Sequence, residues 1–325
     1  MILITSDFHW NDLSRDSYRH SYVDTIFREI KRNRVSQLLI LGDLTDVKNN
    51  HDAWLVNAVF EHIRRLSRAC FVTILKGNHD YTTPSYPFFK SLGLLSHVRW
   101  VNEPWARDDD TLFLPHTNDY KKDWQGLKIK TYKLVFTHNT FEGALAEHGK
   151  ELSGIPRTVF SKGQTVISGD VHVPQKLGPI IYTGSPYPIN FGDSPDKHMI
   201  LLDEDNKISY ISYDGPSKVM IDIPGLDVPM EIKGLKKGDM IKVRVRISGG
   251  ELGDFQKFKE EITAQLEEIG CIVNMIQPIV DRGDPVQVGK RIRKRTDEEV
   301  LEAYSSATGV RETAKKTGLR LLRKV

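Results

Sequence analysis

The sequence contains only two cysteines, Cys70 and Cys271, which lie far apart, each in an apolar setting. We therefore expect two buried free thiols, which is consistent with a cytosolic compartment. The chain also lacks any stretch near the ~20 consecutive apolar residues that a membrane span requires. No basic segment and apolar run precede the first predicted strand, so we expect no signal peptide. There is no internal repeat and no low-complexity tract.

The net charge of the chain is small, but it is unevenly distributed. The whole sequence has 46 Lys and Arg against 43 Asp and Glu, a net charge of +3. From residue 288 onward there are 11 basic and 5 acidic residues, which leaves 35 basic and 38 acidic residues, a net charge of −3, for the rest. A basic tail on a mildly acidic body indicates contact with nucleic acid or an acidic partner. A solvated helix with a basic linker explains the same charges equally well.

Apolar periodicity predicts an α/β protein. Residues 18–32 and 53–67 carry apolar side chains at helical spacing. Their alternation with strands over the first 70 residues implies βαβ units and a mainly parallel start to a sheet. Later short apolar runs predict further strands at 112–114, 134–136, 166–167, 180–182 and 199–202. We expect a two-sheet core with helices outside.

The sequence predicts four segments. A first domain covers residues 1–213, and the proline-containing stretch 214–229 is a predicted linker. Residues 230–285 predict a small β-α-β domain with strands at 240–247 and 271–280 around a helix at 252–269. Residues 286–325 predict a basic linker and a short helix at 297–305, for which Thr296 is the expected N-cap.

Acid, amide and histidine side chains follow five of the apolar runs, at the point where each run ends. In chain order they are Asp7, His9, Asp43, Asp46, Asn78, His79, Asp80, His138, Asp170 and His172. Open α/β sheets build their sites where strands end, so we expect these side chains to converge. Converging strand ends rich in oxygen and nitrogen ligands predict a two-metal hydrolase site.

The separate motifs differ in specificity. Asp7-x-His9 places two ligand types on one side of an extended chain, but alone it is weak. Gly42-Asp43-x-x-Asp46 is better, because the glycine lets the chain turn sharply beside a carboxylate. Gly77-Asn78-His79-Asp80 is the strongest, since an amide oxygen can bind a hard metal while the adjacent histidine faces the substrate. The order and the repeated placement make the whole set specific.

Together with His138 and Gly169-Asp170-x-His172, these motifs resemble the calcineurin-like metallophosphoesterases. Within that superfamily the chain looks most like the SbcD-type DNA nucleases, relatives of the Mre-eleven nuclease and of phage exonuclease subunits. The stretch Gly169-Asp-Val-His-Val-Pro-Gln175, followed by Tyr182-Thr-Gly-Ser-Pro186 and Ile189-Asn-Phe191, carries this finer likeness. The resemblance identifies residues 1–213 as a nuclease domain, 230–285 as a capping domain and the helix in 286–325 as a docking site for an ATPase partner.

The resemblance also implies roles for the site residues. One divalent metal ion would be held by Asp7, His9, Asp43 and His172, and a second by Asp43, Asn78, His138 and Asp170, with Asp43 bridging both. His79 would contact the scissile phosphate or protonate the leaving oxygen. Asp46 and Asp80 are expected to orient the ligands. A mixed oxygen and nitrogen set without thiolate favours Mn²⁺, with Mg²⁺ as the other candidate.

Asp170 departs from the family pattern, which has a histidine at this position. A carboxylate can still bind a hard cation and adds negative charge to the site. We therefore expect Asp170 to be a ligand. The competing interpretation is a weakened second metal site and a slow nuclease.

The resemblance implies a Mn²⁺-dependent DNA exonuclease and endonuclease that acts on duplex ends and single strands in double-strand break repair or recombination. Its expected partners are an SMC-like ATPase of the SbcC type and a second copy of the chain, with no membrane involved. The expected location is cytoplasmic and nucleoid-associated, in a host cell if the chain is viral. Two alternatives stay open: another phosphoesterase, such as a phosphatase or cyclic phosphodiesterase, and a non-catalytic scaffold that binds DNA ends.

Overall fold

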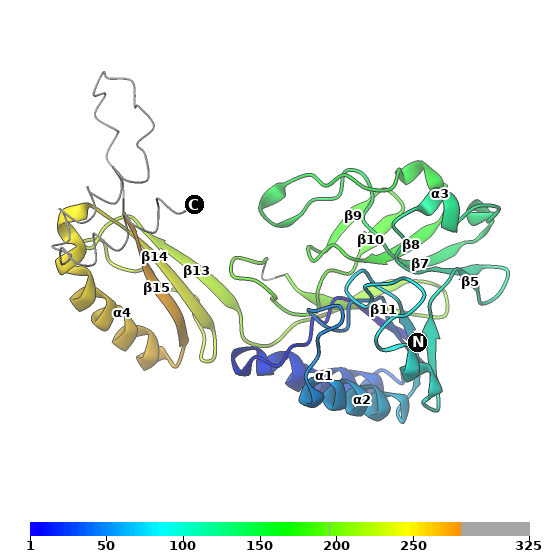
Figure 1. The fold of residues 1–325 in the computed structure, drawn as a ribbon, viewed down its shortest axis with the longest axis horizontal. Helices are drawn as coiled ribbons and strands as arrows, with labels where there is room; N and C mark the ends of the chain where they lie inside the picture. The colour runs from blue at the N-terminus through cyan, green and yellow to red at the C-terminus, as the bar shows by residue number, and fades with distance from the viewer. Residues whose placement is uncertain (195, 281–325) are drawn as a thin grey trace, which may run out of the picture. The chain divides into compact units, whose positions relative to one another are not determined.

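A computed structural model describes residues 1–194 and 196–280 of the chain (Figure 1). The first sheet contains, in spatial order, β12 (Ile208–Ser212), β11 (His198–Leu202), β1 (Ile2–Thr5), β2 (Gln37–Ile40), β3 (Phe71–Leu75) and β4 (Val98–Val101). The strands β1 to β4 are parallel, while β11 and β12 are antiparallel additions. The predicted parallel start to the sheet is confirmed.

The second sheet has the same mixed character. Its strands are, in spatial order, β5 (Trp105–Ala106), β6 (Thr111–Leu114), β7 (Leu134–His138), β8 (Thr165–Gly169), β10 (Ile180–Tyr182) and β9 (Gln175–Leu177). The four central strands are parallel, and the two edge strands are antiparallel. Each later strand that the apolar runs predicted is present.

The alternation of side chains along each strand produces three apolar layers. In β2, Leu38 and Ile40 face a core beneath helices, whereas Leu39 faces a second core. That second core contains side chains of both sheets, so the two sheets pack face to face. A third core, around Phe141 and Phe160, covers the outer face of the second sheet. The α/β two-sheet prediction is confirmed.

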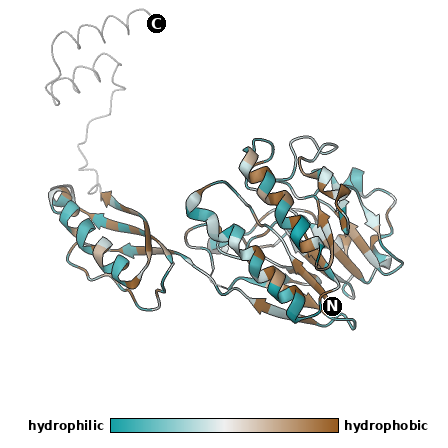
Figure 2. Cartoon of the chain, turned by 90° about the horizontal axis from the view of Figure 1, so that it is seen from below, coloured by the Kyte–Doolittle hydropathy of each residue, from teal (hydrophilic) through white to brown (hydrophobic). Residues whose placement is uncertain are grey.

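The helices of the first sheet are amphipathic, as their mixed colouring in Figure 2 shows. They are α1 (Ser17–Arg32) and α2 (Ala53–Ser67), and both match the predicted helices. Asp52 caps α2 by accepting a hydrogen bond from the backbone N–H of Leu55. Ile26 and Ile63 are fully buried in the core beneath the sheet. A short helix, α3 (Tyr120–Asp123), lies between β6 and β7 in the sequence.

The C-terminal part of the described chain forms a three-stranded sheet with one helix. Its elements are β13 (Lys218–Ile223), β14 (Met240–Ile247), α4 (Phe255–Ile269) and β15 (Ile272–Val280). Strand β13 lies inside the predicted linker 214–229, because only its flanks carry prolines and its own residues pair in parallel with β14. The helix begins at Phe255 rather than 252, because Ser248 and Glu251 form a capping box on a preceding 3-10 turn.

The predicted basic linker and docking helix in 286–325 lie outside the described residues, and the domain boundaries stay predictions. Among the described residues, no helix is both long and apolar enough to cross a membrane. The two thiols are free, with Cys271 buried and Cys70 partly buried.

Candidate metal centre

The carboxyl ends of the parallel strands carry the predicted site residues. Asp7 follows β1, Asp43 follows β2 and Asn78 follows β3 along one edge of the first sheet. His138 ends β7, and Asp170 directly follows β8 in the second sheet. Because the two sheets pack face to face, both edges contribute to a common site. The structure therefore places the predicted residues close to one another, as the strand-end pattern required.

The backbone at this edge adopts a conformation that ordinary side chains avoid. Asp7, His9, Asp43 and Asp170 have φ angles of 55°, 45°, 57° and 80°, in the left-handed region. Such residues cost roughly 1–3 kcal/mol each and cluster at functional sites. Gly42, at φ 94°, leaves room for His138, since a β-carbon there would lie 2.4 Å from its Nδ1 atom.

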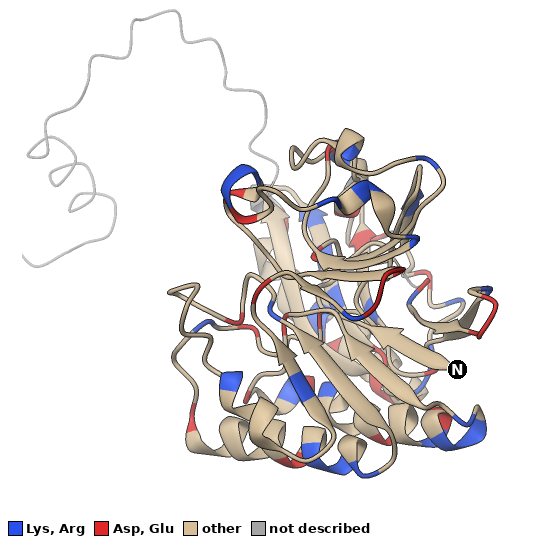
Figure 3. Ribbon diagram, turned by 90° about the vertical axis from the view of Figure 1, so that its right-hand side faces the viewer, with Lys and Arg blue, Asp and Glu red and all other residues tan. Residues whose placement is uncertain are grey.

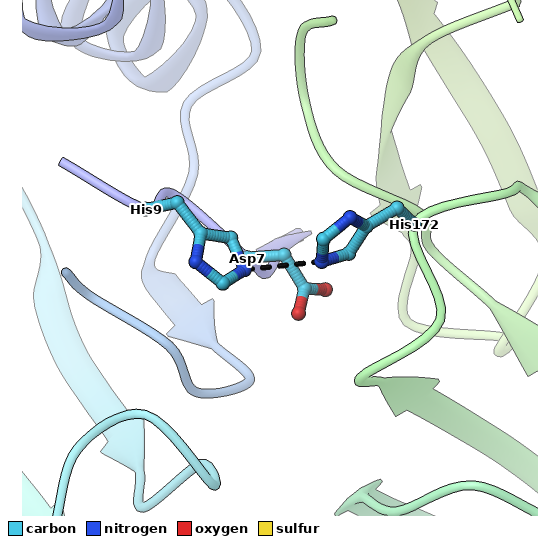
Figure 4. A group of neighbouring side chains, drawn as sticks. All are labelled: Asp7, His9 and His172. Carbon is cyan, nitrogen blue, oxygen red and sulfur yellow. Dashed lines mark hydrogen bonds between the residues drawn. The ribbon is translucent and has the colours of Figure 1, made fainter. Parts of the chain in front are cut away.

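Asp7, His9 and His172 form one cluster, drawn in Figure 4. Nε2 of His9 lies 3.0 Å from Nε2 of His172, and 3.6 Å from a carboxylate oxygen of Asp43. Two ring nitrogens at this separation need a proton or a cation between them. The backbone carbonyl of His172 accepts a hydrogen bond from the buried Lys197 Nζ at 2.8 Å, which holds its loop in place.

Asp43, His138 and Asn78 form a second cluster that shares Asp43 with the first. Nε2 of His138 lies 3.4 Å from Oδ1 of Asp43. Nδ1 of His138 is hydrogen-bonded to the carbonyl of Leu41, which fixes the ring and leaves Nε2 facing the site. Asp7, Asp43 and His138 together satisfy the spacing of a metal-binding group, and all three are buried.

Asp170 lies beside this second cluster. Its Oδ1 atom is 3.8 Å from Nε2 of His138, and its Oδ2 atom accepts a hydrogen bond from the hydroxyl of Thr140. Its backbone N–H donates to Oδ1 of Asp7 at 3.2 Å. One carboxylate oxygen is thus oriented by Thr140 and the other points towards the ligands, which is the arrangement that the expected ligand role needs. The role itself stays a prediction.

His79 lies beside the first cluster and forms a further group with metal-binding spacing together with His9 and Asp43. Its ring centroid is 4.8 Å from that of His9, in an edge-to-face arrangement. Its Nδ1 atom is 2.6 Å from the carbonyl of Asp46, so Nδ1 carries the proton and Nε2 faces the site. Its backbone N–H donates to Oδ1 of Asp43 at 2.8 Å. These two contacts fix the ring beside Asp43, and its role in catalysis stays a prediction.

Asp80 connects two of the ligand loops. Its carboxylate accepts hydrogen bonds from the backbone N–H groups of Gly77, Asp43 and Leu44 at 2.7, 3.0 and 3.0 Å. Because the side chain is 1% exposed, water cannot take its place as the acceptor for these three N–H groups. Asp80 thereby fixes the loop of Asp43 against the loop of Asn78.

Asp46 orients His9 through a buried polar network that the sequence did not predict. Oδ1 of Asp46 lies 3.2 Å from Nδ1 of His9. Oδ2 accepts hydrogen bonds from Asn11 at 2.7 Å and from Arg19 at 3.1 Å. Arg19 also pairs with Asp16 at 3.1 Å, and both are 3% exposed. Arg19 lies on the buried face of α1, one turn before Tyr22 and Val23, so helical spacing marks its position as buried but does not reveal its contact with Asp46.

The close charges shift the pKa values of the ligands in opposite directions. Burial raises the pKa of Asp7 to about 6, with Asp43 as a further cause. Burial would also raise the pKa of Asp43, but His138 and His9 hold it well below its usual range. Burial would lower the pKa of His138, but Asp43 raises it well above its usual value. Burial and the neighbouring His9 lower the pKa of His172 to about 3.

The donor set fits divalent cations. The amide atom of Asn78 that faces Asp43 lies 2.9 and 3.1 Å from its carboxylate oxygens and 3.0 Å from Nε2 of His138. Without a cation, the NH₂ group fits this position because both carboxylate oxygens of Asp43 accept hydrogen bonds. Rotation of the amide brings its oxygen to the same point, where only a cation could bind the four acceptors together. Oxygen and imidazole donors without thiolate suit Mn²⁺ or Mg²⁺ more than a structural zinc site.

Comparisons with known proteins found two similar solved structures and one matching family. YfcE, a phosphoesterase from E. coli, superposes with a TM-score of 0.36 at 15% identity, covering 66% of this chain and 99% of its own. The Pseudomonas putida nuclease MPE superposes with a TM-score of 0.33 at 15% identity, covering 65% and 87%. The calcineurin-like phosphoesterase family model matches residues 1–174, just over half of the chain, and this range includes every predicted site residue. The chain therefore belongs to the calcineurin-like phosphoesterases, a family of metal-dependent hydrolases.

Proposed function

We propose that this phosphoesterase is a Mn²⁺-dependent DNA nuclease of the SbcD type. It cuts phosphodiester bonds at duplex ends and in single strands, in double-strand break repair or recombination. It works as a homodimer with an SMC-like ATPase of the SbcC type, in the cytoplasm near the nucleoid. Mg²⁺ is the second candidate metal.

The segment 182–191, which carries the finer resemblance, supports the proposal because it contacts the metal centre. Oγ1 of Thr183 lies 2.5 Å from the hydroxyl of Ser6, the residue before Asp7, and the carbonyl of Gly184 accepts from the same hydroxyl at 3.2 Å. The hydroxyl of Tyr187 donates to the carbonyl of Phe8 at 2.6 Å. Thr183 and Gly184, which carry part of the resemblance, thus hold the residue before Asp7, and the adjoining Tyr187 holds the residue after it.

The chain offers two ligand sets for the metals. One ion would be held by Asp7, His9, Asp43 and His172. The other would be held by Asp43, Asn78, His138 and Asp170. When bound, two divalent ions neutralise the phosphate, activate a water and stabilise the leaving oxygen of an in-line displacement. Asp46 and Asp80 keep the ligand loops in register through the hydrogen bonds described above.

His79 is positioned to deliver a proton. In hydrolysis of a phosphodiester, a new bond forms between water oxygen and phosphorus, and the bond from phosphorus to the leaving oxygen breaks. The leaving oxygen then needs a proton, and the imidazolium of His79 can donate one from Nε2. The carbonyl of Asp46 keeps Nδ1 protonated throughout, so the ring returns to its starting state by taking a proton at Nε2.

The first alternative is another phosphoesterase activity on the same scaffold. A phosphatase would prefer a phosphomonoester, whereas a nuclease needs a diester with DNA on both sides. The second alternative is a scaffold that binds DNA ends without cutting them. In that case metal would not affect DNA binding, and no product would form.

The experiment incubates the full chain with Mn²⁺ and 3′-labelled duplex DNA, beside a His79→Ala variant and a chelated control. Parallel reactions contain p-nitrophenyl phosphate and bis(p-nitrophenyl) phosphate. The proposal expects metal-dependent release of nucleotides that the variant loses, together with hydrolysis of the small diester. A general acid contributes roughly 10²–10⁴-fold, which sets the size of the expected loss.

Other outcomes separate the alternatives. Rapid hydrolysis of the monoester without cleavage of DNA would establish a phosphatase. DNA binding that is equal with and without metal, and no cleavage, would favour the scaffold.

A further inference from the structure

The segment between β6 and β7 carries an unusual density of positive charge. Residues 120–133 contain five lysines and one aspartate, whereas the chain up to residue 287 has a net charge of −3. Other stretches, such as residues 28–34, are also rich in basic residues, and Figure 3 shows Lys and Arg in several parts of the described chain. The segment also contains two tyrosines and a tryptophan among its lysines. Lysines interleaved with aromatic residues are typical of surfaces that bind single-stranded nucleic acid.

This segment folds around a cavity of about 430 Å³ on the outer side of the second sheet. Its floor is aromatic and apolar, with the rings of Tyr120 and Trp124 in edge-to-face contact at 5.8 Å between centroids. Its rim carries Lys121, Lys128 and Lys130, and its lining includes no acidic residue. The volume lies within the range of ligand pockets. An apolar floor with a cationic rim fits a flat base attached to a phosphate.

The three rim lysines have no partner that would neutralise them. Within residues 1–194 and 196–280, none of them lies within 4.0 Å of a carboxylate, while the nearby Lys133 pairs with Asp110 at 3.1 Å. All three are exposed. Their charge is therefore available to an anion from outside the chain.

A second cavity has lining residues near both this surface and the metal centre. It has a volume of about 580 Å³ and shares Trp124 with the first cavity as a wall. Its lining includes Lys76 and Tyr81, which flank the motif of Asn78 and His79. His116, also in its lining, has its ring centroid 6.2 Å from that of the ligand His138. The two cavities thus adjoin at Trp124.

We propose that the cavity lined by Tyr120, Trp124, Lys121, Lys128 and Lys130 binds a single strand of DNA. Bases pack against the aromatic floor, and phosphates contact the lysines. A single strand is favoured over a duplex because only unstacked bases can enter a cavity. This inference rests on the proposed nuclease function and adds a substrate-binding surface to it.

The test compares the wild-type full chain with a triple variant, Lys121→Ala, Lys128→Ala and Lys130→Ala. A matched control replaces three exposed lysines outside the segment, Lys31→Ala, Lys90→Ala and Lys207→Ala. Fluorescence anisotropy in chelator measures binding to oligo(dT) of about 3 and about 15 nucleotides over a range of salt. Hydrolysis of bis(p-nitrophenyl) phosphate with Mn²⁺ measures the metal centre separately.

The proposal expects the triple variant to bind the long oligonucleotide at least about tenfold more weakly than either other protein. The slope of log affinity against log salt should fall by about 2, because each phosphate contact to a single strand contributes ~0.7. Binding of the short oligonucleotide should also weaken, because the cavity itself can hold it, whereas hydrolysis of the small diester should not change. Equal losses in the control variant, or no loss in the triple variant, would overturn the proposal.

Failure of the two proposals can be told apart. If the wild type binds oligo(dT) through the lysines but never cuts it, the nuclease function is wrong and the binding surface stands. If the wild type cuts DNA but the lysines do not affect binding, the surface is wrong and the function stands. Equally strong competition by poly-glutamate would show a general anion surface and would also overturn the assignment to nucleic acid.

Discussion

Replacement of Asp46 by asparagine tests whether the buried network orients the metal ligand His9. The carboxylate contacts His9 with Oδ1 and contacts Asn11 and Arg19 with Oδ2. An asparagine keeps the shape but has one accepting oxygen. Either His9 or the Arg19 side must then face an NH₂ group, which can only donate.

The size of the effect follows from these contacts. Loss of a partner that orients a ligating histidine typically weakens metal affinity 10- to 100-fold. That factor corresponds to about 1.4–2.7 kcal/mol of binding free energy. The metal-free protein should also lose about 2 kcal/mol of unfolding free energy, the value of a hydrogen bond to a charged group. The loss is not larger because Arg19 keeps its pairing with Asp16.

The pH dependence has a definite sign. Burial would raise the pKa of Asp46, but His9 and Arg19 lower it to about 2, below the usual 3.8. A depressed folded-state pKa stabilises the protein above the unfolded value, and this contribution is lost as pH falls through the folded value. The stability difference between wild type and Asp46→Asn should therefore be full above pH ~4 and shrink towards pH ~2.

Calorimetric titration with Mn²⁺ measures the affinity, and urea unfolding in chelator measures the stability. Asp24→Asn is the matched control, because Asp24 is a surface aspartate, 62% exposed and paired with Arg65. Its loss should change either quantity by less than about 1 kcal/mol. Unchanged Mn²⁺ affinity in Asp46→Asn, with a normal control, would refute the orienting role.

Four further predictions concern the same site. Asp80→Ala should cost about 3–5 kcal/mol of unfolding free energy in urea, because it removes the acceptor of three buried N–H groups. Asp170→Ala should reduce the bound Mn²⁺, counted by elemental analysis after dialysis, from two ions per chain towards one. Mn²⁺ affinity should rise as the pH rises through about 6 and above. Calorimetry in different buffers should show that Mn²⁺ binding releases protons. The reason is that Asp7 and His138 have raised pKa values and bind metal only when deprotonated. Chelation of the metal should lower the Tm reversibly, and excess Mn²⁺ at ~100 times its Kd should restore about 2.7 kcal/mol.

The sequence predicted the elements of this fold wherever one strong pattern was present. The helix at 53–67 matches its observed bounds because an apolar stripe and the capping Asp52 mark it locally. Strand β13 was missed because prolines on both sides made its segment resemble a linker, and its pairing with β14 is a non-local property. The sequence also predicted that the helix includes the 3-10 turn before α4, because the residues of that turn have helical spacing.

The sequence predicted which residues form the site, but it did not predict the residues that hold them in position. Asp43 and His138 are detectable because each ends or follows a buried apolar run. The ligand positions depend just as much on Arg19, Asn11 and Lys197. The role of each of these residues becomes recognisable only through its contacts with distant segments. The lysine-rimmed cavity likewise depends on which face of the second sheet residues 120–133 cover, which periodicity cannot supply.

The backbone of the site explains why its support must be so extensive. Asp7, His9, Asp43 and Asp170 each occupy the left-handed region, at roughly 1–3 kcal/mol per residue. Four such residues together approach the 5–15 kcal/mol by which a typical domain is stable. The strain persists because buried hydrogen bonds hold each loop, as Asp80 does for Asp43. A glycine at any of these positions would relieve the strain but remove a ligand. The chain therefore gives up local stability where the ligands must point into the site, and the two apolar cores on either side of the first sheet make that loss tolerable.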